Sequence, residues 1–418
     1  MDGVDSKAAT SPPGALEGVR VLDLSGPLGN YCGKLFAEMG ADVILVEPTG
    51  GTRARFEPPF LDASPGLERS LSFAYYNTSK RGVTLDLDCT SGQGLLRRLA
   101  ARADIVIETE KPGKMRERGL AYDDLIRVNP SLVYTSITPF GQSGPYAQYA
   151  AEDINGLAMG GLLYLGGYAD TPPMRMHGNQ GILCANMYAS VATMLALLHQ
   201  EKSGQGQQVD VSMQECIVMA LENSVQFFDL EQTVRKRHAG EQRFAGTGVF
   251  ACQDGDIYLM AGGIGANKFW DRTIDWFAEE KMAGVERLRQ EEWARIEYLR
   301  SDEAKHIFAE LFIPWARQRS KDYLYREGQR RRIPIATISE TSDLLGSPQL
   351  AFREYFTKVA HPLREEPLLM PGAPYKLSET PWRIQRPAPM LGEHNAEIYS
   401  EIGVDSSELE QLFAAGVI

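Results

Sequence analysis

The sequence predicts an α/β protein whose first part is a parallel sheet with connecting helices. Within about 30 residues the chain passes from an apolar strand at 19–24 through a Gly-rich turn and a helix to a second apolar strand at 43–47. This pattern is typical of a βαβ unit. The alternation of short strands and helices continues to residue 137, so we expect the first ~150 residues to form one parallel-sheet domain.

The elements after the βαβ unit are predicted from apolar runs and from helix-start signals. A polar turn with two adjacent cations leads into a strand that ends near residue 87. The segment 91–101 is predicted to be a helix capped by Ser91. Further strands are expected at 104–108 and 132–137, with a short basic helix at 114–118 between them.

A long apolar helix is predicted over 182–200, followed by a Gly-rich turn and a half-buried strand at 207–213. A short helix of small residues, 154–161, precedes it. The thirty residues from Thr171 to Gln200 contain no Asp or Glu, and Arg175 is their only formal charge. This stretch can therefore supply no carboxylate to a reaction.

The composition changes near 225–240, which indicates a second, smaller α+β domain. The segments 248–252 and 256–260 flank an Asp-Gly turn and predict a β-hairpin. Charged helical stretches are expected at about 270–277 and 290–318. The chain then returns through loops and short strands to an amphipathic helix near its end.

Composition limits the classes of function. Hydrophobic residues make up 43% of the 418, and the net charge of −12 argues against a nucleic-acid partner. The five cysteines are scattered without metal-ligand spacing, so we expect free thiols, a cytoplasmic location and no bound metal. Residues 1–15 lack the pattern of a signal peptide and are expected to be a flexible tail. No apolar run predicts a membrane span.

Seven stretches, in order along nearly the whole chain, resemble the class III CoA-transferases, which include formyl-CoA and carnitine CoA-transferases and methylacyl-CoA racemase. They are LEGVRVLDL, GADVILVEP, YYNTSKRGVTLDL, FGQSGPY, EDINGLAMGG, LALLHQEKSGQGQQVDVSM and LGEHNAEIYSEIG. The resemblance implies a Rossmann-like large domain formed by both chain ends, a smaller middle domain, and an interlocked dimer. The expected divisions are a tail at 1–15, the large domain at 16–225 and 341–418, and the small domain with its linkers at 226–340.

The resemblance also implies a reaction, in which a carboxylate nucleophile attacks an acyl-CoA thioester and CoA passes to a second carboxylate. CoA thioester is then a substrate, and no cofactor is bound permanently. In the family the nucleophilic Asp precedes the long helix. Counting back from the Gly-rich turn, its place falls on Ile182, or on Gly181 if the loop differs by one residue. Neither residue can act as the nucleophile.

Candidate binding residues follow from the same resemblance, each beside a simpler interpretation. Lys80 and Arg81, or Lys111, are either phosphate ligands or solvated charges. Asp153 is either part of the active-site wall or a helix N-cap. Arg175 and His177 either hold a substrate carboxylate or are ordinary loop residues. The CoA-binding candidates are Lys80, Arg81, Thr109, Lys111 and Gly113, and the substrate-binding candidates are Asp153, Arg175 and His177.

The sequence therefore predicts a subunit of a heteromeric CoA-transferase whose homologous partner supplies the nucleophile. Succinyl-CoA as donor and an aromatic succinate such as benzylsuccinate as acceptor are the expected substrates. One alternative is a CoA-thioester-binding protein, or a lyase or isomerase that uses Glu152 and Asp153. Another is a self-sufficient transferase that draws its acid from elsewhere in the fold.

Overall fold

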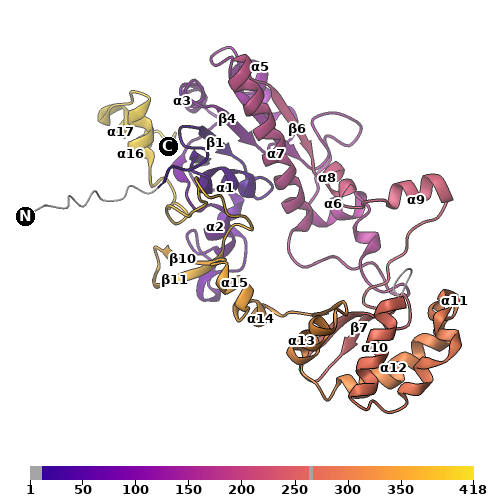
Figure 1. Cartoon of the computed structure of the whole chain (residues 1–418). Helices are drawn as coiled ribbons and strands as arrows, with labels where there is room; N and C mark the ends of the chain where they lie inside the picture. Colours follow the sequence, from indigo (N-terminus) through magenta and orange to yellow (C-terminus); the bar gives the residue numbers. More distant parts are fainter. Residues whose placement is uncertain (1–11, 263–266) are drawn as a thin grey trace, which may run out of the picture. The chain divides into compact units, whose positions relative to one another are not determined.

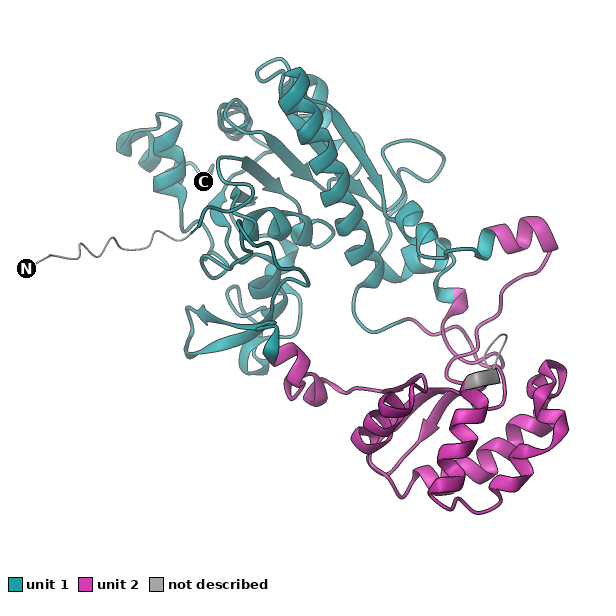
Figure 2. Cartoon of the chain, in the orientation of Figure 1, with its two compact units in different colours: residues 1–163, 176–225, 352–418 teal, residues 164–175, 226–351 magenta. Residues whose placement is uncertain are grey.

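The computed structural model describes residues 12–262 and 267–418, which form two compact units (Figures 1 and 2). Unit 1 comprises the residues up to 163 together with 176–225 and 352–418, and unit 2 comprises 164–175 and 226–351. Each unit has a hydrophobic core of its own. Of the tail expected at 1–15, residues 1–11 lie outside the described part of the chain.

Unit 1 is built on a six-stranded sheet with the order β3-β2-β1-β4-β5-β6. All five strand pairs are parallel, so the predicted α/β class and parallel sheet are confirmed. This is the strand order of a Rossmann fold. The strands are β1 (Arg20–Leu24), β2 (Asp42–Glu47), β3 (Arg81–Thr84), β4 (Ile105–Glu108), β5 (Val133–Thr138) and β6 (Gln208–Ser212).

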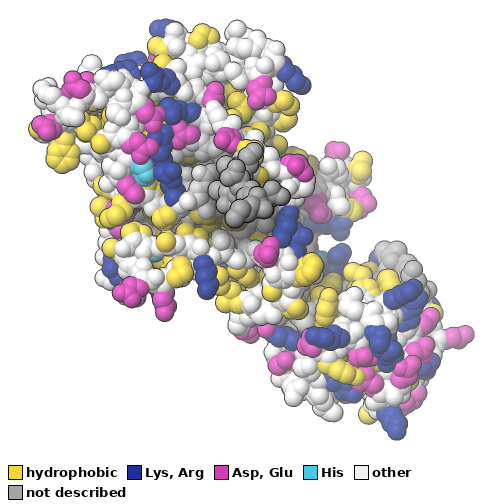
Figure 3. All heavy atoms as spheres, turned by 60° about the vertical axis from the view of Figure 1, so that its left-hand side comes forward, with side chains coloured by type: hydrophobic (Ala, Val, Ile, Leu, Met, Phe, Trp, Pro, Cys, Tyr) yellow, Lys and Arg dark blue, Asp and Glu magenta, His cyan; other side chains and the backbone are white. Residues whose placement is uncertain are grey.

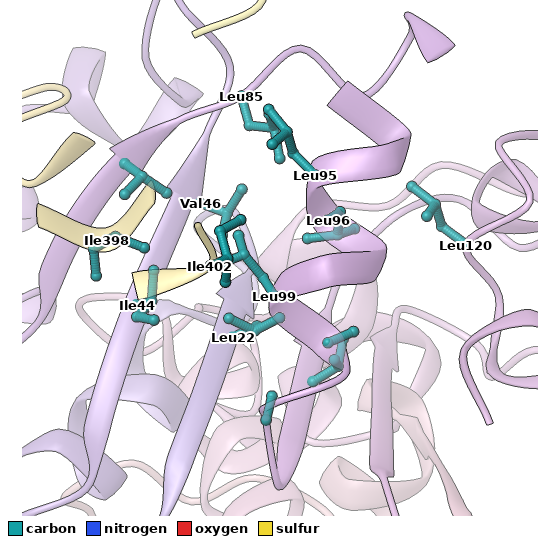
Figure 4. Close-up of a cluster of buried hydrophobic side chains, with 14 of the residues drawn as sticks. Leu22, Ile44, Val46, Leu85, Leu95, Leu96, Leu99, Leu120, Ile398 and Ile402 are labelled. Atoms are coloured by element: carbon teal, nitrogen blue, oxygen red, sulfur yellow. The ribbon is translucent and has the colours of Figure 1, made fainter. Parts of the chain in front are cut away.

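Helices α3 (Thr90–Ala100) and α16 (Asn395–Glu401) pack on one face of this sheet, as Figure 4 shows. Leu22 and Ile44 of the sheet are fully buried there against Leu99 of α3 and Ile398 of α16. The chain's last helix, α17 (Ser406–Ala414), and the terminal residues Val417 and Ile418 complete the cluster. Residues more than 300 positions apart therefore share one core.

Helices α1 (Asn30–Glu38) and α7 (Gln180–Ser203) cover the opposite face. The alternate residues of the strands point there, since successive side chains in a strand face opposite sides. α7 has 24 residues and is longer than the predicted 182–200. It ends at Gly204, whose φ of 72° suits a helix C-terminus.

The start of α3 corrects one prediction. The cap is Cys89, whose Sγ accepts a hydrogen bond from the Gly92 amide at 3.3 Å, and Ser91 lies inside the helix. A Cβ at Gly92 would lie 1.8 Å from the Asp86 carbonyl oxygen. The close approach of two backbone segments therefore sets the helix start, and no capping motif in the sequence signals it.

The remaining elements of unit 1 are short. They are the helices α2 (Leu71–Tyr76), α4 (Lys114–Glu117), α5 (Tyr122–Leu125), α6 (Asp153–Met159) and α8 (Met213–Met219), and the 3-10 turns Arg53–Phe56 and Leu61–Ala63. Helix α15 (Pro348–Phe352) belongs to unit 2 except for its last residue, Phe352. Strands β10 (Phe356–His361) and β11 (Arg364–Pro371) form an antiparallel hairpin. The 3-10 turn Leu163–Leu165 and helix α9 (Ser224–Glu231) cross from one unit to the other along the chain.

Unit 2 contains an antiparallel sheet of β7 (Thr247–Ala251), β8 (Asp256–Met260) and β9 (Ile335–Thr337). β7 and β8 are the predicted hairpin. Its helices are α10 (Asn267–Glu279), α11 (Ile296–Arg300), α12 (Asp302–Ala316), α13 (Lys321–Arg331) and α14 (Thr341–Leu345), with 3-10 turns at Val285–Arg289 and Glu291–Ala294. Figure 3 shows Lys and Arg side chains interspersed with Asp and Glu on the visible face of this unit.

One helix among the described residues, α7, is long and apolar enough to cross a membrane by length and composition. Of its most apolar 18-residue window, 39% is buried in the structure. Core helices of soluble proteins meet the same criterion, and α7 packs on the sheet through residues such as Ala185, Ala189 and Leu197. The helix is therefore weak evidence for a membrane span.

Candidate functional site

Ligands of folds with this strand order bind at the carboxyl ends of the strands where the order reverses, here between β1 and β4. The turn after β1 and the residue after β4 meet at this point. The Gly26 amide donates a hydrogen bond to Thr109 Oγ1 at 2.9 Å. A Cβ at Gly29 would lie 2.7 Å from Thr109 Cγ2, so the Gly-rich turn is needed for this close approach. Thr109, a predicted CoA contact, thus lies at the reversal point.

Lys80 is fully buried beneath that turn. Its Nζ donates to Asp23 Oδ2 at 2.7 Å, to the Asn30 carbonyl at 2.8 Å and to Asn77 Oδ1 at 2.8 Å. An ammonium has three donors, and all three are used. The contacts give Lys80 an internal role, and its predicted phosphate contact stays a prediction.

Arg81 is likewise engaged within unit 1. Its Nε and Nη2 donate to Asp42 at 2.9 and 2.6 Å. Its Nη1 donates to Glu397 and Glu401 of α16 at 2.7 and 2.6 Å. The side chain is 9% exposed. The guanidinium of Arg81 thus joins β2 to α16, and its predicted contact with CoA stays a prediction.

Lys111 and Gly113 do line a cavity, of about 350 Å³, on unit 1. Its other walls come from the ends of β4 and β5, from the loop 140–148 and from the start of β6. Gln148 Nε2 donates to the Pro112 carbonyl at 3.0 Å, which ties two of these loops together. The cavity is lined by Glu108, Lys111, Pro112, Gly113, Met115, Arg116, Ala121, Tyr122, Asp123, Tyr134, Ser136, Gln142, Gln148 and Gln208.

The carboxyl of Glu108 lies at the inner wall of this cavity and is 3% exposed. Burial raises the pKa of Glu108 to about 7, and the carboxylates of Glu110 and Asp210 add to the rise. The Glu110 amide donates to Glu108 Oε2 at 2.6 Å, and this hydrogen bond offsets part of the rise in pKa. A carboxyl that changes its charge near neutral pH is typical of functional sites.

The start of α7 is the predicted position of the family's nucleophile. The Ile182 amide donates to Asp153 Oδ1 at 3.0 Å, and Asp153 is 4% exposed. A carboxylate is stabilised at this end of a helix by the unpaired amides and the helix dipole. Asp153 therefore caps α7 from another helix, and it does not cap α6, in which it is the first residue.

The side chain of Ile182 lines a small cavity of about 20 Å³ with Tyr31, Phe73 and Tyr76. Gly181 packs tightly, since a Cβ there would lie 2.9 Å from Ile217 Cδ1 and 3.2 Å from Asp153 Oδ1. An aliphatic side chain thus fills the place at which the family resemblance puts a carboxylate.

The other predicted residues do not line the cavity of unit 1. Arg175 belongs to unit 2 and His177 to unit 1, and both are exposed. Glu152 is exposed and pairs with Arg53 at 2.9 Å. All five cysteines are free thiols. Within 12–262 and 267–418, no group of three His, Cys, Asp or Glu side chains could hold a metal ion.

Sequence reasoning did not identify Glu108, Ser136 or Gln142 as a group. One signal was present, because Glu108 ends an apolar strand and Ser136 interrupts another. In a parallel sheet buried on both faces, strands are usually near-continuous apolar runs. Polar residues on neighbouring strands of such a sheet indicate a ligand or a polar cavity.

The sheet, its strand order and the site at its carboxyl edge define an α/β protein of Rossmann type. The model of CoA-transferase family III matches residues 16–395, and the chain belongs to this family. The subunit BbsE of succinyl-CoA:(R)-benzylsuccinate CoA-transferase from Thauera aromatica is 38% identical over 96% of this chain and 97% of its own. The succinate–glutarate CoA-transferase of Agrobacterium fabrum is 32% identical, with 94% and 96% covered.

A solved structure agrees with the fold. The CAIB/BAIF family protein from Brucella suis superposes with a TM-score of 0.82 at 27% identity, over 93% of this chain and all of the other. Family membership and the mixed α/β fold, both expected from the sequence motifs, are thereby confirmed.

Proposed function

We propose that this chain is the non-nucleophile subunit of a heteromeric class III CoA-transferase. The proposal is supported by the start of α7, where Ile182 stands at the position that the family resemblance predicts for the carboxylate and the Ile182 amide donates to Asp153. Family membership supports CoA transfer as the reaction. The absence of an acid between Thr171 and Gln200 supports a homologous partner as the source of the nucleophile.

The proposed reaction begins on the partner's Asp. Its carboxylate attacks the acyl-CoA carbonyl, and the C–S bond breaks to give a mixed anhydride and CoA thiolate. The thiolate then attacks the aspartyl carbonyl and releases the donor acid as a carboxylate. The acceptor carboxylate then attacks the carbonyl of the aspartyl-CoA thioester and releases CoA thiolate, which leaves a second mixed anhydride. The thiolate attacks the acceptor's carbonyl in this anhydride, so the acceptor's CoA thioester forms and the partner's Asp is regenerated. Charge develops on the carbonyl oxygen in each attack, so backbone amides at the site stabilise it.

Succinyl-CoA as donor and benzylsuccinate as acceptor are proposed from the likeness to BbsE. The chain would take part in binding the CoA thioester through Thr109, Lys111 and Gly113, two of which line the cavity of unit 1. Arg175 and His177, both exposed, remain proposed contacts of the substrate carboxylate. No permanently bound cofactor is needed for this chemistry. The five free cysteines support a cytoplasmic location.

The outer face of α7 supports a protein partner. Met187, Val191 and Leu195 follow one another at one helical turn and are 59%, 58% and 63% exposed. A helix that is apolar on all sides is normally buried on all sides. A homologous chain packed on this face, as in the interlocked dimer that the family resemblance implies, would remove these side chains from water.

A lyase or isomerase that uses Glu152 and Asp153 is less well supported. One oxygen of Asp153 accepts from the Ile182 amide, the other is buried without a hydrogen-bond partner among the described residues, and Glu152 is exposed beside Arg53. The alternative function is therefore a protein that binds a CoA thioester without catalysis.

The test is reconstitution. A homologous CoA-transferase chain that carries the nucleophilic Asp is sought among the genes beside that of this chain. The two chains are purified separately and together, and CoA transfer from succinyl-CoA to benzylsuccinate is measured. We expect transfer only from the mixture. The acyl-enzyme is trapped with hydroxylamine, and the label is expected on the partner's Asp. Ile182→Val serves as the control and should leave transfer unchanged. Full transfer from this chain alone would refute the proposal.

A further inference from the structure

The cavity of unit 1 has a floor unlike that of an ordinary α/β sheet. On the face shared with α3, β4 and β5 present apolar or aromatic residues near their starts and polar residues near their ends. Glu108 ends β4, and Ser136 and Thr138 follow Tyr134 on the same face of β5. All of these side chains are at most 3% exposed. Of these polar side chains, Glu108 and Ser136 line the cavity and Thr138 does not. Burying a polar group without a partner is costly, so Ser136 on this floor calls for a specific occupant.

Two polar side-chain atoms at the cavity, Ser136 Oγ and Gln142 Nε2, lack a hydrogen-bond partner among the described residues. Ser136 Oγ lies near the Glu108 carboxyl, yet neither Ser136 Oγ nor Gln142 Nε2 makes a well-aligned hydrogen bond within the described residues, although both atoms are buried. Both residues line the cavity. A hydroxyl can donate or accept, and an amide nitrogen only donates.

The loop that carries Gln142 is held in place. The Gln142 amide donates to both oxygens of Asp210 on β6, at 3.0 and 3.1 Å. The preceding Gly141 has a φ of 84°, a conformation that favours glycine. Together with the bond from Gln148 to Pro112, these contacts fix the walls before any ligand binds. Such preformed cavities of about 300–1,000 Å³ are typical small-molecule sites.

The charges around the cavity select the kind of group that fits. Glu108 at the floor disfavours an anion. Lys111 at the wall disfavours a cation, and Arg116, which also lines the cavity, pairs with the lining residue Asp123 at 3.4 Å. A neutral group that offers a donor toward Glu108 and an acceptor toward Gln142 would satisfy both sides of the cavity, with Ser136 free to bond either.

We propose that this cavity is a subsite for a neutral ligand edge that pairs a hydrogen-bond donor with an acceptor, as a secondary amide or an aminopurine base does. The inference rests on the proposed function, because a CoA thioester carries both groups, the amides in its pantetheine arm and the purine in its nucleotide. Ser136 and Gln142 are then binding residues.

The experiment measures binding of CoA, pantetheine and adenosine 3′,5′-bisphosphate to the full chain by calorimetry, alone and with its homologous partner. Ser136→Ala removes a hydroxyl that has no well-aligned partner in the described chain, so the variant is expected to fold. Gln142→Glu replaces the donor by an acceptor. Each is expected to weaken CoA binding about tenfold, the worth of one good hydrogen bond. Glu117→Gln, an exposed carboxyl on α4 outside the cavity, is the matched control and should have no effect.

The outcomes show which part of CoA supplies the paired hydrogen-bond donor and acceptor. Weakened binding of the bisphosphate assigns the cavity to the purine, and weakened binding of pantetheine assigns it to an amide. Unchanged CoA affinity in both variants overturns the subsite and leaves the proposed function intact, since that is judged by transfer in the mixture. Variants that lose assembly with the partner but keep CoA affinity also overturn it, in favour of a protein contact. So does a wild-type chain that binds none of the three probes in either state.

Discussion

The carboxyl of Glu108 should make the chain less stable as the pH rises through neutrality. Its pKa is raised from an ordinary 4.5 to about 7 by burial. The folded chain therefore holds this proton more tightly than the unfolded chain, and unfolding releases it between these two pH values. Since stability falls with rising pH wherever the folded state binds more protons, the free energy of unfolding declines from about pH 4.5 to about pH 7 and then levels off.

The magnitude follows from the gap between the two pKa values. At about 1.4 kcal/mol per pKa unit, a gap of about 2.5 units amounts to roughly 3 kcal/mol. Glu108→Gln mimics the protonated carboxyl at every pH. The Gln side chain keeps a carbonyl oxygen that can accept the bond from the Glu110 amide. We therefore expect the variant to match the wild type near pH 4.5 and to exceed its stability by about 3 kcal/mol at pH 8.

The assay is urea denaturation followed by circular dichroism at several values between pH 4.5 and pH 8. The control is Glu117→Gln, whose carboxyl is 73% exposed and should show a difference from the wild type that is small and nearly constant with pH. A Glu108→Gln curve that runs parallel to the wild type across the same range would refute the reasoning.

Three further variants test the internal contacts by the same denaturation assay. Lys80→Met leaves a buried carboxylate without its cation and should cost about 3–5 kcal/mol, whereas Lys114→Met, on the surface of α4, should cost less than about 1; equal effects would contradict the assigned internal role. Asp153→Ala removes the cap of α7 and should cost about 1–2 kcal/mol, and unchanged stability would show that the helix needs no cap. Gly33→Ala should cost about 1–3 kcal/mol, because its Cβ would lie 2.1 Å from the Asp23 oxygen that pairs with Lys80. Gly94→Ala, with nothing within 4 Å, should instead stabilise α3 by about 0.5–1 kcal/mol, so a loss at both glycines would refute the steric argument.

The sheet of unit 1 could be predicted because its strands are short apolar runs separated by turn and helix signals, as in the βαβ unit that ends at Glu47. The position predicted for the nucleophile, at Ile182, could be located only through the family resemblance, by counting back from the Gly-rich turn. Periodicity alone would have described a core helix there.

The partners of the charged residues were not predictable from the sequence. Lys80 and Asp23 lie 57 residues apart, and the sequence at Lys80 resembles that of any exposed cation. The group of Glu108, Ser136 and Gln142 was not predicted for a similar reason, because its members come from three separate segments of the chain. Ion pairs and cavities depend on tertiary packing, on which local patterns carry little information.

The attachment of α16 has a consequence for the order in which the chain folds during synthesis. Arg81 bonds to Glu397 and Glu401, more than 300 residues later, and Ile398 and Ile418 complete the core around Leu22. Domains generally fold as units as they leave the ribosome. Unit 2, almost all of it one continuous segment, can fold while unit 1 still lacks part of its core. On the face that α3 covers in part, the nascent chain therefore lacks α16 and α17 until translation is nearly finished, and apolar side chains such as Ile44 stay incompletely covered during this interval.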